Sequence, residues 1–112
     1  MNDIKLSKDA DLLICLIYKH YLQLHDNGIS KIKAKELNSV YDFHFLVPDW
    51  SIDDLYDTCL ELKENNLLSA KTRYISDNRF KFYLSNTAIV YMENRFKNGI
   101  KEIANFITSF IP

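Results

Sequence analysis

Glycine and proline are scarce in this chain, which has two of each among its 112 residues. Because these residues often interrupt helices and strands, their scarcity favours long helices joined by short connections. No apolar run approaches the roughly 20 residues that a membrane-spanning helix needs. Residues 1–5 also lack the apolar region of a signal peptide. We therefore expect a cytoplasmic protein without a membrane segment.

Cysteine is scarce as well, and Cys15 and Cys59 each fall on the apolar side of a predicted helix. A buried thiol packs there as a small hydrophobe, and a disulfide is not expected in a reducing compartment. The sequence has no CxxC pair, no histidine pair with helical metal-ligand spacing and no glycine-rich phosphate loop. We therefore predict no catalytic residue, no metal and no cofactor, and a protein that is not an enzyme.

The length and composition are those of one ordinary folded domain, with 47% hydrophobic and 26% charged residues. The net charge of −1 conceals an asymmetry along the chain. Residues 1–66 carry seven lysines and twelve acidic residues, whereas residues 67–112 carry seven basic and three acidic residues. Such a charge separation suits either an oppositely charged partner or self-assembly.

Apolar residues recur at three- and four-residue steps between Ala10 and Leu22, which predicts a central first helix capped by Ser7. The sequence Asp26-Asn27-Gly28 should end it. A short second helix is predicted from Lys31 to about Ser39, capped by Ser30. We expect Ile32 and Leu37 to face inward in it, with Ile29 packing just ahead of the cap.

Residues 42–50 are aromatic and irregular in pattern, and Pro48 disfavours helix at Val47. Here Tyr41, Phe43, Phe45 and Trp50 either form an interface or fill a gap beside the next helix. That third helix should start after Ser51 and end near Asn65. Its expected inner face consists of Ile52, Leu55, Tyr56, Cys59 and Leu62. Its outer face carries five carboxylates against the single Lys63, and these are Asp53, Asp54, Asp57, Glu61 and Glu64.

Two strands, at about residues 68–74 and 80–84, are predicted to form a hairpin. If Tyr74 and Phe80 both face the core, side-chain alternation requires an odd loop, which the three residues 76–78 provide. Asn78 is then the residue expected to adopt a left-handed conformation. The expected core face consists of Ala70, Thr72, Tyr74, Phe80, Phe82 and Leu84. The opposite face would carry Lys71, Arg73, Lys81 and Tyr83, with Arg79 close by.

A last helix, capped by Ser85, is predicted to run to Phe110. Its apolar stripe extends over several turns and outruns a domain this small, so we predict a homodimer that uses it. The expected interface residues are Ile89, Met92, Phe96, Ile100, Ile103, Phe106, Ile107 and Phe110. Two alternatives stay open. The helix could fold back over the first helix and complete a monomeric core, and Asn98-Gly99 could break it in two.

The predicted order of helix, short helix, helix, two-stranded ribbon and long helix resembles a winged helix-turn-helix domain. Leu84-Ser85-Asn86-Thr87-Ala88 resembles the Leu-Thr-x-x-Gly step that often leads from the wing into the last helix, with Ser for Thr and Ala for Gly. Residues 91–94, 99–103 and 106–107 are similar to the C-terminal part of the YjcQ-like winged-helix proteins of Gram-positive bacteria and their phages.

The resemblance implies a mainly α fold with a small β-hairpin (α+β), a winged helix-turn-helix with a long C-terminal helix. Residues 1–85 would form the winged-helix domain, and residues 86–112 a C-terminal helical arm of the same domain. In such a domain the third helix normally enters the major groove of DNA. Here the helix offers Asp53, Asp54, Asp57, Thr58 and Glu61, and clustered carboxylates repel phosphates. This face could be solvated, dock a basic protein, or read the groove directly.

The hairpin, or wing, is the better candidate for nucleic acid. Its cations Lys71, Arg73, Arg79 and Lys81 could lie along a phosphate backbone beside Tyr83, although exposed strands also carry such residues for solubility. We therefore predict a regulatory protein that associates with double-stranded DNA mainly through the wing. The alternative is a protein-interaction module of phage or mobile-element type. It would bind a basic partner through Asp53, Asp54, Asp57 and Glu61, without DNA.

Overall fold

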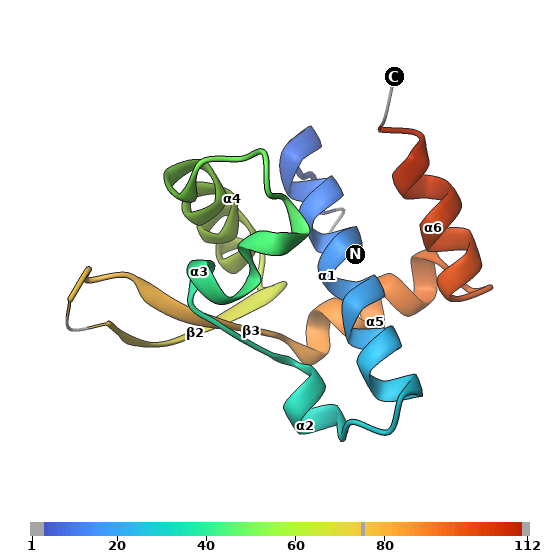
Figure 1. Ribbon diagram of the computed structural model, residues 1–112. Helices are drawn as coiled ribbons and strands as arrows, with labels where there is room; N and C mark the ends of the chain where they lie inside the picture. Colours follow the sequence, from blue (N-terminus) through green and yellow to red (C-terminus); the bar gives the residue numbers. More distant parts are fainter. Residues whose placement is uncertain (1–3, 75, 111–112) are drawn as a thin grey trace.

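Helices make up most of the fold, and one small antiparallel sheet projects from them in the computed structural model (Figure 1). The structure describes residues 4–74 and 76–110. The helical elements are α1 (Lys8–Asp26), α2 (Lys31–Ala34), α3 (Val40–Phe43), the 3-10 helix η1 (His44–Leu46), α4 (Ile52–Glu64), α5 (Asn86–Arg95) and α6 (Ile100–Thr108). The strands are β1 (Glu36–Asn38), β2 (Leu68–Arg73) and β3 (Phe80–Leu84). The α+β class is confirmed.

Helix α1 is central, as its broad apolar stripe predicted. The Ser7 hydroxyl accepts a hydrogen bond from the Ala10 amide at 3.2 Å, and the chain turns after Asp26 through Gly28 at φ +94°. Figure 1 shows α1 lying between α4 and α6, and its inward side chains are buried from Ala10 to Tyr21. Within the described ranges, none of the helices combines the length and apolar character that crossing a bilayer requires.

The predicted second helix is wrong in its second half, because it ends at Ala34 and residues 36–38 form β1. Strand β1 pairs antiparallel with β3, and the Leu84 amide donates to the Lys35 carbonyl at 2.8 Å. An isolated helix this short is marginal, so pairing with a distant strand decides the conformation. As a consequence Ile32 is 74% exposed and Ile29 is also exposed, whereas Leu37 is buried as expected.

The aromatic segment after β1 is more regular than its sequence indicated, since it forms α3 and η1. Asp42 stabilises the start of α3 by accepting hydrogen bonds at 3.0 Å from both the amide and the hydroxyl of Ser39. Phe43 is buried and Trp50 is half-buried, so these two fill the gap beside α4. Tyr41 and Phe45 remain exposed.

Helix α4 agrees with the sequence prediction in its bounds, its cap and its inner face. The Ser51 hydroxyl accepts from the Asp54 amide at 3.0 Å. Leu55, Cys59 and Leu62 are fully buried, and Ile52 and Tyr56 are half-buried. The Thr58 side chain, considered as a groove contact, is instead buried and donates to the Asp54 carbonyl at 2.8 Å.

The predicted hairpin exists, but its register differs from the expected one. The sheet order is β1-β3-β2, and Asn78 adopts the left-handed conformation at φ +59° as predicted. Ala70 lies opposite Phe82, and after a bulge Arg73, not Tyr74, lies opposite Phe80. Thr72 is exposed rather than core-facing. Because one extra residue reverses the side-chain alternation, the bulge reassigns the faces of the outer half of β2.

The prediction of one long C-terminal helix is wrong and the alternative of a break at Asn98-Gly99 is confirmed, since α5 ends at Arg95 and α6 starts at Ile100. Gly99 at φ +77° permits the turn, and α6 packs back against α1 on the side away from the hairpin (Figure 1). Of the expected dimer residues, Met92, Phe96 and Ile103 are buried within the chain itself. The others are half-buried: Ile89, Ile100, Phe106, Ile107 and Phe110. A homodimer stays a prediction, and in this conformation only the second group could contribute to it.

Candidate functional site

The cations of the hairpin lie on both of its faces rather than on one. Two lysines share one face with two tyrosines: the ammonium of Lys71 lies 4.8 Å from the centre of the Tyr83 ring, and that of Lys81 lies 4.8 Å from the Tyr74 ring. We call these four residues the outer face. Each ammonium lies against a tyrosine ring, and the Tyr74 hydroxyl donates to Asp42 of α3 at 3.4 Å, so a carboxylate borders this face.

Arg73, which the sequence placed beside these lysines, instead lies on the face that turns toward α4. Its guanidinium carbon is 4.6 Å from the centre of the Phe80 ring, and the Lys63 ammonium is 5.3 Å from the same ring. The Phe80 ring in turn contacts the buried Phe82, with ring centres 6.4 Å apart. The bulge before Arg73 explains this reversal, because it turns the residue to the side of its partner Phe80.

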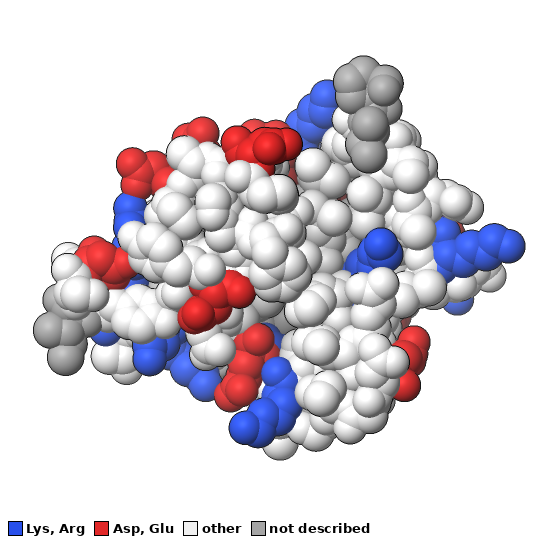
Figure 2. Space-filling model, viewed as in Figure 1, with Lys and Arg blue, Asp and Glu red and all other residues white. Residues whose placement is uncertain are grey.

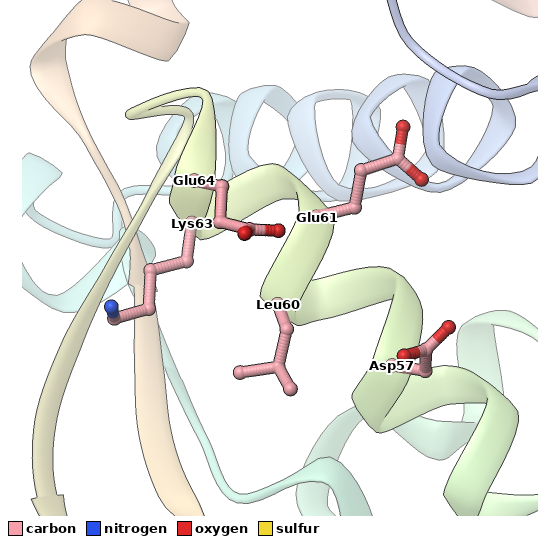
Figure 3. A pocket seen from close by; sticks show the side chains of 5 residues that line it. All are labelled: Asp57, Leu60, Glu61, Lys63 and Glu64. Carbon is pink, nitrogen blue, oxygen red and sulfur yellow. The ribbon is translucent and has the colours of Figure 1, made fainter.

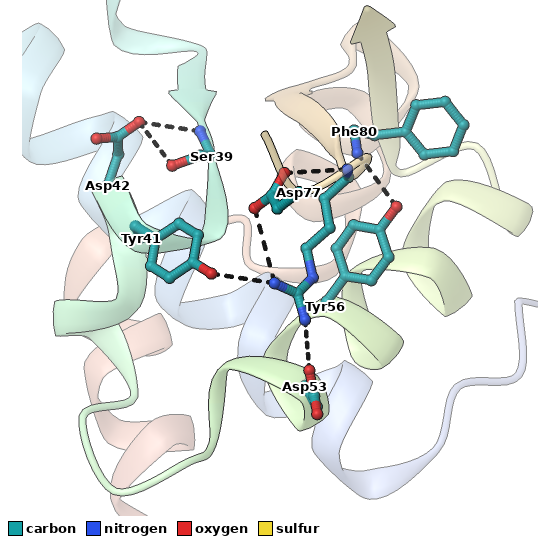
Figure 4. Close-up of polar contacts among 8 residues, drawn as sticks. Ser39, Tyr41, Asp42, Asp53, Tyr56, Asp77 and Phe80 are labelled. Atoms are coloured by element: carbon teal, nitrogen blue, oxygen red, sulfur yellow. Dashed lines mark hydrogen bonds and ion pairs between the residues drawn. The ribbon is translucent and has the colours of Figure 1, made fainter. Parts of the chain in front are cut away.

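Arg79 reaches from the hairpin to α3 and α4, where it contacts Tyr41 and Asp53, which Figure 4 labels. One guanidinium nitrogen forms an ion pair with Asp53 at the start of α4, and the other donates to the Tyr41 hydroxyl at 3.1 Å. The second nitrogen also lies 3.7 Å from Asp77, and the guanidinium lies over the Tyr56 ring at 5.4 Å. Arg79 therefore does not join the outer face, and two sites that the sequence treated separately meet at this residue.

The acidic face of α4 forms a shallow groove lined by Asp57, Leu60, Glu61, Lys63 and Glu64 (Figure 3). The carboxylates are not equivalent. Glu61 accepts from the amide and the hydroxyl of Ser7 at 2.7 and 2.6 Å, and Asp53 holds Arg79. Within residues 4–74 and 76–110, no ion pair is formed by the exposed Asp54, Asp57 or Glu64.

Negative charge gathers on the exposed face of α4, whereas the hairpin carries both its cations and Asp77 and meets α4 at the Asp53–Arg79 ion pair. Figure 2 shows acidic side chains around α4 and basic side chains along the lower edge of the hairpin. A second groove lies between α2 and the outer face, lined by Ile32, Lys35, Glu36, Lys71 and Tyr83. The sequence alone could not place Lys35 beside Lys71, because that proximity depends on the pairing of the three-residue strand β1 with β3.

The ionisable groups of the interior have structural roles. Arg95 binds both oxygens of Asp11, at 2.5 and 3.0 Å, and joins α5 to α1. Hydrogen bonding to Asp11 raises the pKa of Arg95 above its usual range despite its partial burial. Burial raises the pKa of the Cys15 thiol to about 12 and that of Cys59 further still. Both cysteines are therefore protonated at neutral pH and are poor nucleophiles.

Among the described residues, no group of three or more His, Cys, Asp and Glu side chains is placed to hold a metal ion. Comparison of the chain with protein-family models, with curated proteins and with solved structures finds no match. A function must therefore be argued from the geometry of the hairpin and α4.

Proposed function

We propose that this protein is a winged-helix regulatory domain that binds duplex DNA through the β2–β3 hairpin. The order of α1, a short helix, α4 and the hairpin supports this assignment of fold. The observation that carries the function is the distribution of cations on both faces of one projecting hairpin, with Lys71 and Lys81 on the outer face and Arg73 turned toward α4.

A two-stranded β-ribbon has the width of the DNA major groove, and a phosphate backbone runs along each wall of that groove. A ribbon with cations on both faces can approach both walls, whereas a ribbon with cations on one face approaches one. The Tyr83 hydroxyl of the outer face can donate to a phosphate oxygen beside Lys71, whereas the Tyr74 hydroxyl already donates to Asp42 at 3.4 Å. The sequence alone predicted a hairpin that lies along one phosphate backbone. The cations on both faces favour a hairpin that lies between the two backbones of the major groove.

Helix α4 has no part in base reading in this proposal. Its exposed Asp54, Asp57 and Glu64 oppose the approach of phosphates. Contacts made by the hairpin alone would be mainly with the backbone and therefore little dependent on sequence. We expect weak, salt-sensitive binding with modest sequence preference.

Fluorescence anisotropy with a labelled random-sequence duplex tests the proposal. Three hairpin cations, Lys71, Arg73 and Lys81, form no ion pair within the described ranges. Neutralising three phosphates predicts a log–log salt slope of about −2.7, or roughly 40-fold weaker binding at 200 mM than at 50 mM salt. Absence of binding at 50 mM salt, or binding that does not respond to salt, would rule the proposal out.

A second candidate function is supported by the groove on α4, where half-buried Leu60 lies among carboxylates. A lysine-rich helix could place an apolar side chain on Leu60 and pair its charges with Asp57 and Glu64. This alternative predicts no duplex binding at low salt. It also predicts salt-sensitive binding of a lysine-rich helical peptide, which should be lost when Asp54, Asp57 and Glu64 are replaced by their amides.

A further inference from the structure

Arg79 differs from the other hairpin cations because Asp53, Asp77 and the Tyr41 hydroxyl, all labelled in Figure 4, already contact its guanidinium. Asp53 binds one nitrogen, while Tyr41 at 3.1 Å and Asp77 at 3.7 Å approach the other. The Arg79 side chain is 22% exposed, whereas that of Asp53 is 84% exposed. Asp53 therefore covers the guanidinium from the solvent side, where an external ligand would have to approach.

A guanidinium recognises carboxylate and phosphate oxygens with the same fork of N–H donors. The Asp53 carboxylate thus occupies a position that a phosphate oxygen could take at the same nitrogen. Tyr41 and Asp77 would keep the guanidinium oriented after such an exchange, because they bind its other nitrogen. Exposed ion pairs add little stability, so the highly exposed Asp53 side chain can rotate away without disturbing the core.

We propose that Asp53 masks Arg79 and that a phosphate of the bound duplex displaces it. This contact is autoinhibitory, because it withholds one hairpin cation from nucleic acid and adds a carboxylate next to the binding surface. The inference rests on the proposed function. It assigns to Asp53, which the sequence placed in a possible protein-docking face, a regulatory role toward the hairpin instead.

The replacement Asp53→Asn tests this mechanism, with Asp54→Asn as the matched control. Both changes remove one negative charge from the first turn of α4, but only Asp53 contacts Arg79. Unmasking one further cation should steepen the log–log salt slope by about 0.9 and tighten duplex binding roughly 15-fold at 50 mM salt. The control should leave the slope unchanged and tighten binding less than about threefold, because solvent and salt screen a charge that makes no direct contact.

A double-mutant cycle with Arg79→Ala separates masking from general electrostatics. In the Arg79→Ala background, Asp53→Asn should raise the affinity for duplex DNA no more than Asp54→Asn does, because there is no guanidinium to release. Circular dichroism confirms that each variant is folded. If the wild type binds duplex but Asp53→Asn and Asp54→Asn have equal effects, masking is wrong and the proposed function stands. If neither the wild type nor any variant binds duplex at 50 mM salt, the masking mechanism and the proposed function are both wrong.

Discussion

Replacing Ile103 with alanine is expected to lower the free energy of unfolding by about 3 kcal/mol, because large-to-small changes in a core cost about 2–5 kcal/mol. Ile103 is fully buried, and it lies on α6 where that helix packs against α1. The cost combines the lost burial of the side chain with the cavity that remains. Urea denaturation followed by circular dichroism measures it.

Asn105→Ala serves as the control, since Asn105 is exposed on the same helix and its replacement should change stability by less than about 0.5 kcal/mol. This comparison also distinguishes the two arrangements of the C-terminal region that the sequence left open. If α6 leaves α1 and joins a second chain, unfolding of the wild type depends on protein concentration. A loss below about 1 kcal/mol for Ile103→Ala, with concentration-dependent unfolding, would contradict the packing described here.

The double replacement Lys71→Gln with Lys81→Gln is expected to weaken duplex binding by roughly 200-fold at 50 mM salt, since each lost phosphate contact lowers the log–log salt slope by about 0.9. Both lysines lie on the outer face against tyrosine rings. The slope should therefore fall from about −2.7 to about −0.9. Salt titrations by fluorescence anisotropy report the affinity and the slope together.

The control for this variant is Lys97→Gln with Lys101→Gln, which removes the same net charge. Lys97 and Lys101 are exposed in the C-terminal region, where α6 lies on the side of the molecule away from the hairpin (Figure 1). Screening at this ionic strength limits their effect to less than about threefold. Equal losses in the two double variants would mean that only overall charge attracts DNA, and the hairpin would have no special role.

The elements that the sequence predicted well are those with local signals. Ser7 and Ser51 cap α1 and α4 through contacts three residues along the chain, and Asn78 supplies the left-handed residue of the hairpin loop. Strand β1 was missed because its three residues are held by pairing with β3, more than 40 residues later. Asn98-Gly99 gave a local signal for a break in the last helix, but packing of α6 on α1 decides whether the chain turns there.

The candidate site was predicted less well than the fold, for two physical reasons. The bulge in β2 reverses side-chain alternation after Ala70, so Arg73 faces α4, and alternation in the sequence cannot reveal a bulge. The Asp53–Arg79 ion pair joins residues 26 positions apart. Sequence analysis therefore assigned one residue to an acidic helix and the other to a basic wing, although the fold brings them into contact.

The most direct test of the account is an NMR titration of the ¹⁵N-labelled protein with a short random-sequence duplex at low salt. The backbone amides of residues 71–74 and 79–83 should shift, and those of residues 57–64 on α4 should stay in place. Shifts concentrated on α4 with an unchanged hairpin, or no shifts at millimolar duplex, would contradict the claim that the hairpin is the surface that binds DNA.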